Sequence, residues 1–321
     1  MLAQHFVDAG YVVHTTSSYP NRILRLVDMV LSLIRWRKQI DIVVVMVFSG
    51  SAFFLVDIAS WLSCRLNIPL ILWLHGGNLP QFAYAHEKWV RRVYQRAQVL
   101  VVPSAYLVES ANKLDVDVEV IPNILAIDNY AYHLRQQVQP KLLWMRTFHE
   151  IYNPTLAIQV VAELVANYPD IQLTMAGQDK GLLQQTRELV EAQELTANVQ
   201  FAGFLDMPAK QTAFESHDIF LNTNKIDNMP VSVVEAAAFG LPIVATNVGG
   251  IPHLLKDSQT ALLVEDGDVL DMANAVRRLL NDPDLSARLS YNGRRLAETC
   301  SWTHVQAQWE TVFQQINDRG R

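Results

Sequence analysis

Cysteine is scarce in this sequence, and charged side chains are few. Cys64 and Cys300 are the only cysteines among 321 residues and lie far apart, which argues against a disulfide framework and a cysteine-based zinc site. The nine histidines form no metal-ligand motif, so we expect neither a metal nor a cofactor. Lys and Arg total 26 against 32 acidic residues, a net charge of −6, which argues against a nucleic-acid partner.

We also expect neither a signal peptide nor a membrane-spanning helix. The first ten residues lack the order of charged and then apolar residues that marks a signal peptide. Residues 42–62 are apolar enough to cross a bilayer, but Asp57 and the sequence Ser49-Gly50-Ser51 interrupt them. We therefore expect a buried strand over 42–48 and a helix over 52–66, in a cytoplasmic protein.

The sequence does contain a regular alternation of strand and helix patterns. Half of its residues are hydrophobic, enough for two cores. The alternation runs over residues 11–121 and again over 141–264, with a polar stretch between them. It predicts an α/β fold with two doubly wound, parallel-sheet (Rossmann-like) domains facing a cleft. The predicted parts are 1–135, 136–300 and a C-terminal helix over 301–321 that packs back toward the first domain.

Two predicted helices of the first domain have distinctive faces. After a strand over residues 11–16, a helix over 21–38 places six apolar residues on one face, namely Ile23, Leu26, Val27, Val30, Leu31 and Ile34. A helix over 84–95 carries a basic face formed with its flanking residue, namely Lys88, Arg91, Arg92 and Arg96 beside Trp89. The basic face indicates either a solvated surface or peripheral contact with anionic lipid headgroups.

Residues 227–250 have the clearest signs of a binding site. Pro230 and Gly240 suit the start and end of a helix that is apolar on every face except at Glu235. Because burying an unpaired carboxylate is costly, Glu235 indicates either a ligand contact or a buried Arg or Lys partner. Asp227 precedes the helix start, where free backbone N–H groups favour anions. The stretch therefore predicts a pocket for a phosphate-bearing ligand with hydroxyl groups.

The same stretch resembles the donor-site signature of glycosyltransferase family 4 (glycosyl transferases group 1), which has the GT-B fold. Asp227 and Glu235 match its two acidic positions, and Gly-Leu-Pro, a strand and Gly-Gly follow as in the family. The resemblance implies that Glu235 holds the ribose hydroxyls of a nucleotide sugar. It implies that Asp227 and the residues after it hold the sugar and the diphosphate, namely Asn228, Met229, Val231 and Ser232.

Three more positions fit this resemblance. Arg146 follows the first strand of the second domain, where the family places a diphosphate-binding Arg. Gly203 lies at a strand end where family members hold the base. His75, before two glycines at a strand end, is implied to lie near the transferred sugar, so it joins Asp227 and Glu235 as a catalytic candidate. The alternatives are a surface ion pair for Arg146 and a structural role for His75.

The sequence departs from the family pattern at three places. Pro230 stands where the family often has Gly and has no N–H to donate. Ile151 stands where the family usually has a Lys, which leaves Arg146 with more of the phosphate charge. Family members also open with a strand and a glycine-rich loop, and we expect both to be absent here.

The resemblance implies a retaining, metal-independent glycosyltransferase. Such an enzyme moves a sugar from a nucleoside-diphosphate sugar to a hydroxyl of a glycan or lipid-linked acceptor. One alternative is a partner subunit that binds nucleotide without turnover, which the missing start favours. The other is a sugar-nucleotide epimerase of the same fold, for which Asp57, Glu87 and Glu109 are the available acid–base carboxylates.

Overall fold

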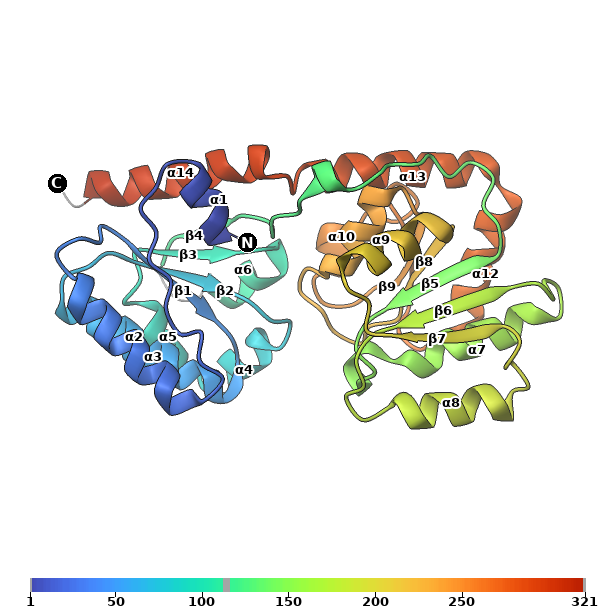
Figure 1. The fold of residues 1–321 in the computed structure, drawn as a ribbon, viewed down its shortest axis with the longest axis horizontal. Coiled ribbons are helices and arrows are strands. Elements are labelled where there is room, and N and C mark those ends of the chain that lie inside the picture. Colours follow the sequence, from blue (N-terminus) through green and yellow to red (C-terminus); the bar gives the residue numbers. More distant parts are fainter. Residues whose placement is uncertain (1, 112–115, 320–321) are drawn as a thin grey trace. The chain divides into compact units, whose positions relative to one another are not determined.

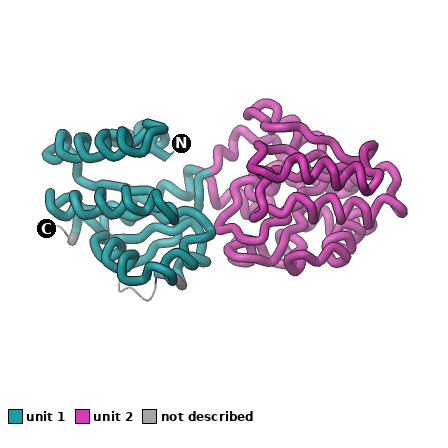
Figure 2. The backbone as a smooth tube through the Cα atoms, turned by 90° about the horizontal axis from the view of Figure 1, so that it is seen from below, with its two compact units in different colours: residues 1–124, 302–321 teal, residues 125–301 magenta. Residues whose placement is uncertain are grey.

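The computed structural model describes residues 2–111 and 116–319 (Figure 1). The chain forms two compact units, residues 1–124 with 302–321 and residues 125–301 (Figure 2). The C-terminal helix therefore belongs to the first unit. The boundary lies at residue 125 and differs from the predicted one, because residues 125–135 pack with the second unit.

The first unit combines one sheet with helices on both of its faces. Its elements are α1 (Leu2–Asp8), α2 (Arg22–Trp36), β1 (Val43–Val47), α3 (Phe53–Arg65), β2 (Leu70–Leu74), α4 (Leu79–Ala85), α5 (Glu87–Tyr94), β3 (Val99–Val102), α6 (Val108–Ala111), β4 (Val118–Val120) and α14 (Trp302–Arg319). The four strands are parallel in the order β1-β2-β3-β4. Every residue of β2 and β3 is buried, which explains why these strands are continuous runs of Val, Leu and Ile with a single Trp.

The apolar stretch over residues 42–62 forms a strand and a helix, as the sequence predicts. It supplies β1 and most of α3, with a short 3₁₀ turn over Gly50–Ala52 between them. In the part of the chain that the structure describes, no helix is both long and apolar enough to cross a membrane.

The predicted strand over residues 11–16 is wrong, because this segment pairs with no strand and is largely exposed. Thr16 Oγ1 and the Ser17 amide donate to Asp28 Oδ2 of α2, at 2.8 and 2.7 Å. The ring of His14 stacks on that of Trp36, with centroids 4.3 Å apart. Side-chain contacts with α2 thus hold the segment in place of a ladder of backbone hydrogen bonds.

The helix α2 buries only part of the apolar face that its sequence predicts. Its cap is Asn21, whose side chain accepts from the first free amides of the helix. Met29 and Leu33 are its buried residues and pack with Ala59 and Leu62 of α3. Four residues of the predicted face are exposed, and we call them the α2 stripe: Ile23, Val27, Leu31 and Ile34. The apolar arc is wider than its contact with α3, so one side stays in solvent.

An acidic side chain on α3 neutralises part of the basic face of α5. Asp57 forms ion pairs with Arg96 at 2.6 Å and with Arg92 at 2.8 Å, and it accepts from the indole N–H of Trp89 at 2.7 Å. Burial raises the pKa of Asp57, but the hydrogen bonds from Trp89 and Arg96 outweigh it and lower the pKa overall. Asp57 therefore links two helices and is engaged in structure.

The second unit has a six-stranded parallel sheet in the order β10-β9-β8-β5-β6-β7. Its elements are β5 (Lys141–Met145), α7 (Pro154–Val165), β6 (Gln172–Ala176), α8 (Leu183–Ala192), β7 (Val199–Gly203), α9 (Met207–Ser216), β8 (Ile219–Asn222), α10 (Val231–Phe239), β9 (Ile243–Thr246), α11 (Ile251–Leu254), β10 (Leu262–Val264), α12 (Val269–Asn281) and α13 (Pro283–Glu298). The strand order reverses between β5 and β8, and ligands bind such sheets at the carboxyl ends beside this switch point.

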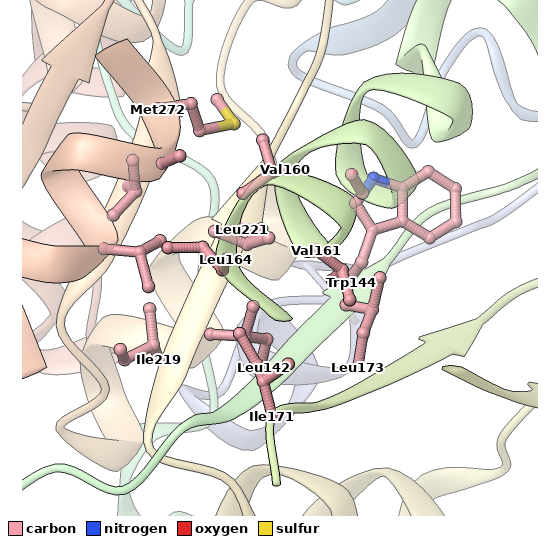
Figure 3. Packing of buried hydrophobic residues seen from close by; sticks show 14 of the residues in the cluster. Leu142, Trp144, Val160, Val161, Leu164, Ile171, Leu173, Ile219, Leu221 and Met272 are labelled. Carbon is pink, nitrogen blue, oxygen red and sulfur yellow. The ribbon is translucent and has the colours of Figure 1, made fainter. Parts of the chain in front are cut away.

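One large apolar core holds β5 and β8 in position (Figure 3). Trp144 on β5 is fully buried there among Leu142, Leu173 and Leu221. Its indole N–H donates to Thr223 Oγ1 at 2.8 Å, just past the end of β8. The core therefore fixes the carboxyl ends of the two strands at which the sheet reverses.

Arg135 explains why residues 125–135 belong to the second unit. Its side chain is 8% exposed and pairs with Asp218, with Nε 3.1 Å from Oδ1. The guanidinium also donates to five backbone carbonyl oxygens, those of His133, Phe214, Glu215, His217 and Phe239. A guanidinium with this many acceptors ties residues 125–135 to the ends of α9 and α10.

Candidate functional site

The helix α10 begins and ends where the sequence predicts. Pro230 is its N-terminal cap and offers no side-chain hydrogen bond, so the first amides stay free of a cap. Gly240 ends the helix with φ of 84°, and a Cβ there would collide with the carbonyl oxygen of His133. All of α10 except Val231 is buried. An uncapped helix start thus lies beside the carboxyl ends of β8 and β9.

Arg146 and Asp227 form an ion pair at this edge of the sheet. The Arg146 guanidinium also lies over the ring of Tyr152, 4.4 Å from its centroid. Burial lowers the pKa of Arg146, while the neighbouring charge of Glu235 acts in the opposite direction. The structure therefore brings together the predicted cation and both predicted carboxylates.

Asn224 orients Asp227, and the sequence analysis missed it. Its side-chain amide donates to Asp227 Oδ2 at 2.8 Å, while the backbone amide of Asn228 donates to Oδ1 at 2.8 Å. The Asp227 carboxylate is thus held on both oxygens. Asn224 lies three residues before Asp227 in the same loop, so its proximity in sequence was the available signal.

The glycine turn after β9 closes on the loop that carries Asp227. The Gly250 amide donates to the Asp227 carbonyl oxygen at 2.8 Å. A Cβ on Gly250 would lie far inside van der Waals contact with the Asn228 carbonyl, and one on Gly249 would collide with the Asp227 carbonyl. The two glycines are therefore required by close backbone approach.

Glu235 lies in the middle of α10 and has a basic partner. A buried Arg or Lys partner was the alternative to a ligand contact in the sequence analysis. Lys210 Nζ of α9 lies 2.5 Å from Glu235 Oε1, and the hydroxyl of Tyr130 donates to the same oxygen at 3.3 Å. Burial and the Glu235 carboxylate both raise the pKa of Tyr130, which keeps its hydroxyl protonated. Sequence reasoning missed Lys210, because no pattern links two residues 25 positions apart on different helices.

Buried polar atoms without a partner gather at the same edge of the sheet. Four such atoms have no hydrogen bond to any described residue: Arg146 Nε, Asn222 Nδ2, Asn224 Oδ1 and Ser232 Oγ. They include donors and an acceptor, and they come from the residue after β5, the last residue of β8, the following loop and the first turn of α10. Buried polar groups in folded proteins are rarely unsatisfied, so this cluster points to a polar ligand.

Three other predicted donor-site residues lie on the surrounding elements. Gly203 ends β7 with φ of 68°, and nothing lies within 4 Å of where its Cβ would be. Met229 is buried beside α10, whereas the side chain of Val231 is 43% exposed at the helix start. Among the described residues, no group of three His, Cys, Asp or Glu side chains could hold a metal ion.

His75 belongs to the first unit and lies at the end of β2. Its ring packs against those of Trp73 and Phe48, with centroids 4.2 and 5.4 Å away. Its Nε2 is buried and has no hydrogen-bond partner among the described residues. Burial lowers the pKa of His75 to about 4, so its imidazole is neutral near pH 7 and available to a polar ligand.

The chain belongs to the family of glycosyl transferases group 1. The sequence model of that family matches residues 132–296, just over half of the chain, and the model "Glycosyltransferase Family 4" matches residues 3–128. The two matches cover both units, which agrees with the resemblance carried by residues 227–250.

Curated relatives extend the comparison. The chain is 23% identical to the N-acetyl-alpha-D-glucosaminyl L-malate synthase of Bacillus anthracis, over 78% of this chain and 68% of that protein. It is 27% identical to the D-inositol 3-phosphate glycosyltransferase of Rhodococcus jostii, over 47% of this chain and 35% of that protein. A phosphatidyl-myo-inositol mannosyltransferase of Mycobacterium leprae is 24% identical over 72% of this chain and 62% of that protein. The matched part thus spans from about one third to about two thirds of these relatives.

Solved structures with the same fold are GT-B glycosyltransferases. A sucrose-phosphate synthase from Thermosynechococcus elongatus has a TM-score of 0.77 at 16% identity, covering 99% of this chain and 92% of that one. HepE of Anabaena, crystallised with UDP, has a TM-score of 0.76 at 17% identity, covering 89% and 82%. At such identities the likeness establishes the fold, which is the predicted GT-B class with two parallel-sheet α/β units.

The depressed pKa of His75 predicts a pH-dependent stability of the first unit. Between pH 6.5 and 4 the unfolded chain binds a proton that the folded chain does not, so stability falls as pH falls through this window. From pH 7.5 to 5.0 the wild type should lose about 2 kcal/mol more than His75→Gln. Urea unfolding followed by tryptophan fluorescence measures the difference. His133→Gln, which changes an exposed histidine of the second unit, should retain the wild-type dependence; a His75→Gln profile matching wild type would contradict the assignment.

Proposed function

We propose that the protein transfers a sugar from a nucleoside-diphosphate sugar to a hydroxyl group of a glycan or lipid-linked acceptor. The observation that carries this proposal is the cluster of unpartnered polar atoms beside Arg146, Asp227 and Glu235. The phosphates of such a donor need a cation and free backbone amides, and its hydroxyls need carboxylates. This edge of the sheet offers all of these groups. Family membership and the UDP bound by HepE support the same interpretation.

Donor binding would exchange partners at the Arg146–Asp227 ion pair. The diphosphate would accept from Arg146, including its unpartnered Nε, and from the amides of Val231 and Ser232 at the uncapped helix start. Asp227, still held by Asn224, would then accept from a sugar hydroxyl. Glu235 would accept from the ribose hydroxyls. The exchange keeps Arg146 paired with an anion and keeps Asp227 hydrogen-bonded in both states, which lowers its cost.

In the proposed mechanism the site would stabilise a departing diphosphate without a metal. As the sugar–phosphate bond breaks, charge grows on the leaving oxygen, and Arg146 and the α10 dipole are placed to offset it. Retention of the anomeric configuration follows if the acceptor hydroxyl attacks from the face that the diphosphate leaves. The departing phosphate would then take the proton of the acceptor hydroxyl, so no protein base is needed.

Product stereochemistry and chelation test this mechanism. With an α-linked donor of gluco or galacto configuration, the anomeric proton of the product should show the small coupling constant of an α-glycoside in proton NMR. The initial rate should stay within about twofold when EDTA is added, because Arg146 and the helix dipole replace a cation. A β-linked product, or loss of activity on chelation that Mg²⁺ or Mn²⁺ restores, would contradict the mechanism.

A nucleotide panel tests the donor site directly. Thermal-shift titrations with UDP, GDP and ADP should single out one diphosphate that raises the unfolding temperature. Glu235→Ala should weaken its binding by about 1.5–3 kcal/mol, the range for a charge-assisted hydrogen bond. Glu163→Ala, which removes the carboxylate paired with Arg277 on α12, is the matched control and should bind normally. Equal affinities in wild type and Glu235→Ala would refute the ribose role.

Neither alternative function gains support from the site. Asp57, a candidate acid–base group for an epimerase, is held by Arg92 and Arg96. Glu87 is paired with Arg91, and the side chain of Glu109 lies outside the described residues. A nucleotide-binding partner subunit without turnover would show binding in the panel but no product with any acceptor.

Peripheral contact with a membrane is proposed through α2. The basic face of α5 is largely paired, since Arg91 bonds to Glu87 and Arg92 to Asp57. By contrast, the α2 stripe is exposed, and the three arginines on the same helix form no ion pair with any described residue; these are Arg22, Arg25 and Arg35. Exposed apolar side chains on a helix that also carries arginines without an acidic partner suit an anionic bilayer surface.

Vesicle sedimentation tests this contact. The protein should bind vesicles containing phosphatidylserine more tightly than neutral ones. Leu31→Glu should weaken that binding by about tenfold or more, because it removes an apolar side chain from the bilayer and adds a negative charge. Leu270→Glu is a matched control, since Leu270 is 59% exposed and Leu31 60%. Equal loss in both variants, or no binding of the wild type, would contradict the proposal.

A further inference from the structure

Lys210 meets Glu235 at one oxygen only. Its Nζ lies 2.5 Å from Oε1, and the Tyr130 hydroxyl bonds to the same atom at 3.3 Å. The other oxygen, Oε2, has no hydrogen-bond partner among the described residues. The carboxylate is therefore held firmly by one atom while the second keeps its capacity to accept.

The position of Lys210 is fixed by the start of α9. Asp206 caps this helix, with its side chain accepting from the Ala209 amide at 3.0 Å, and the Lys210 amide donates to the Asp206 carbonyl at 2.8 Å. The Lys210 side chain is 21% exposed and that of Glu235 6%. The ammonium thus lies between solvent and a nearly buried carboxylate.

We propose that Lys210 positions Glu235 for the ribose diol of the donor. By occupying Oε1 it neutralises the buried carboxylate, fixes its rotamer and leaves Oε2 to accept from the vicinal hydroxyls. This proposal rests on the proposed function, because it concerns how the same site reads its nucleotide. Lys210 is a positioning residue and touches no reacting atom.

The choice of lysine over arginine matters in this arrangement. An ammonium is a compact donor that satisfies one carboxylate oxygen, whereas a guanidinium forms two parallel hydrogen bonds and engages both oxygens. Arginine at position 210 would preserve the charge but compete with the diol for Oε2. Methionine would keep the length of the side chain and remove the charge. The two substitutions therefore separate charge neutralisation from the availability of Oε2.

Discrimination between ribose and its deoxy analogue measures diol recognition. Calorimetric titration would give the Kd of the nucleoside diphosphate selected by the panel and of its 2′,3′-dideoxy analogue. The ratio of the two is taken within each variant, so a change in stability cancels. In the wild type the ribose form should bind roughly 10- to 100-fold more tightly. Glu235→Gln should reduce this ratio severalfold.

The Lys210 variants decide the inference. Lys210→Met should reduce the preference for the ribose form severalfold. Lys210→Arg should bring the ratio close to one, although the guanidinium keeps the positive charge. Lys210→Gln replaces Lys210→Met if the latter fails to fold. Lys141→Met is the control, since Lys141 is exposed at the amino end of β5, and it should keep the wild-type ratio.

Three results would overturn the proposal in different ways. If both Lys210 variants keep the wild-type ratio while Glu235→Gln loses it, Lys210 only stabilises the scaffold and the donor site stands. If no nucleoside diphosphate binds the wild type, the proposed function itself fails. A wild-type ratio near one would remove diol recognition by Glu235 and with it the role of Lys210.

Discussion

The second unit depends on neutralising two carboxylates in largely apolar surroundings. Asp227 and Glu235 lie at the carboxyl edge of a parallel sheet, where transfer from water would cost each several kcal/mol without compensation. The chain supplies Arg146 to the first and Lys210 to the second. Each pairing is stable without a ligand, yet each leaves polar atoms unpartnered nearby. A site built this way is folded when empty and still has hydrogen-bonding capacity for a ligand.

Sheet topology determines where these charges meet. The reversal of strand order between β5 and β8 places the loop after each strand at one edge, and the fully buried Trp144 holds both strand ends. The glycine turn at Gly249 and Gly250 then closes against the Asp227 loop, because a side chain there would collide with the backbone. Packing remote from the ligand thus sets the position of the groups that would bind it.

Most of the fold could be predicted from periodicity, because buried parallel strands and their helices have distinct patterns. Apart from the boundary between the units, the failures lie in the first unit. The segment at 11–16 is rich in β-branched residues like a strand, but Thr16 and the adjacent Ser17 bond to Asp28, and the segment pairs with no strand. The apolar face of α2 follows from periodicity, but periodicity measures the width of an apolar arc and not what covers it. Hence residues such as Leu31 are exposed.

The sequence alone determined the local chemistry: an apolar helix between Pro230 and Gly240, a carboxylate within it, and a glycine turn after it. These follow from backbone preferences and short spacing, which act within a few residues. Only the tertiary structure decided the partners, namely Lys210 and Tyr130 for Glu235 and the ring of Tyr152 for Arg146. The reason is physical, since such contacts depend on how separate elements pack, and no local pattern encodes the distance between them.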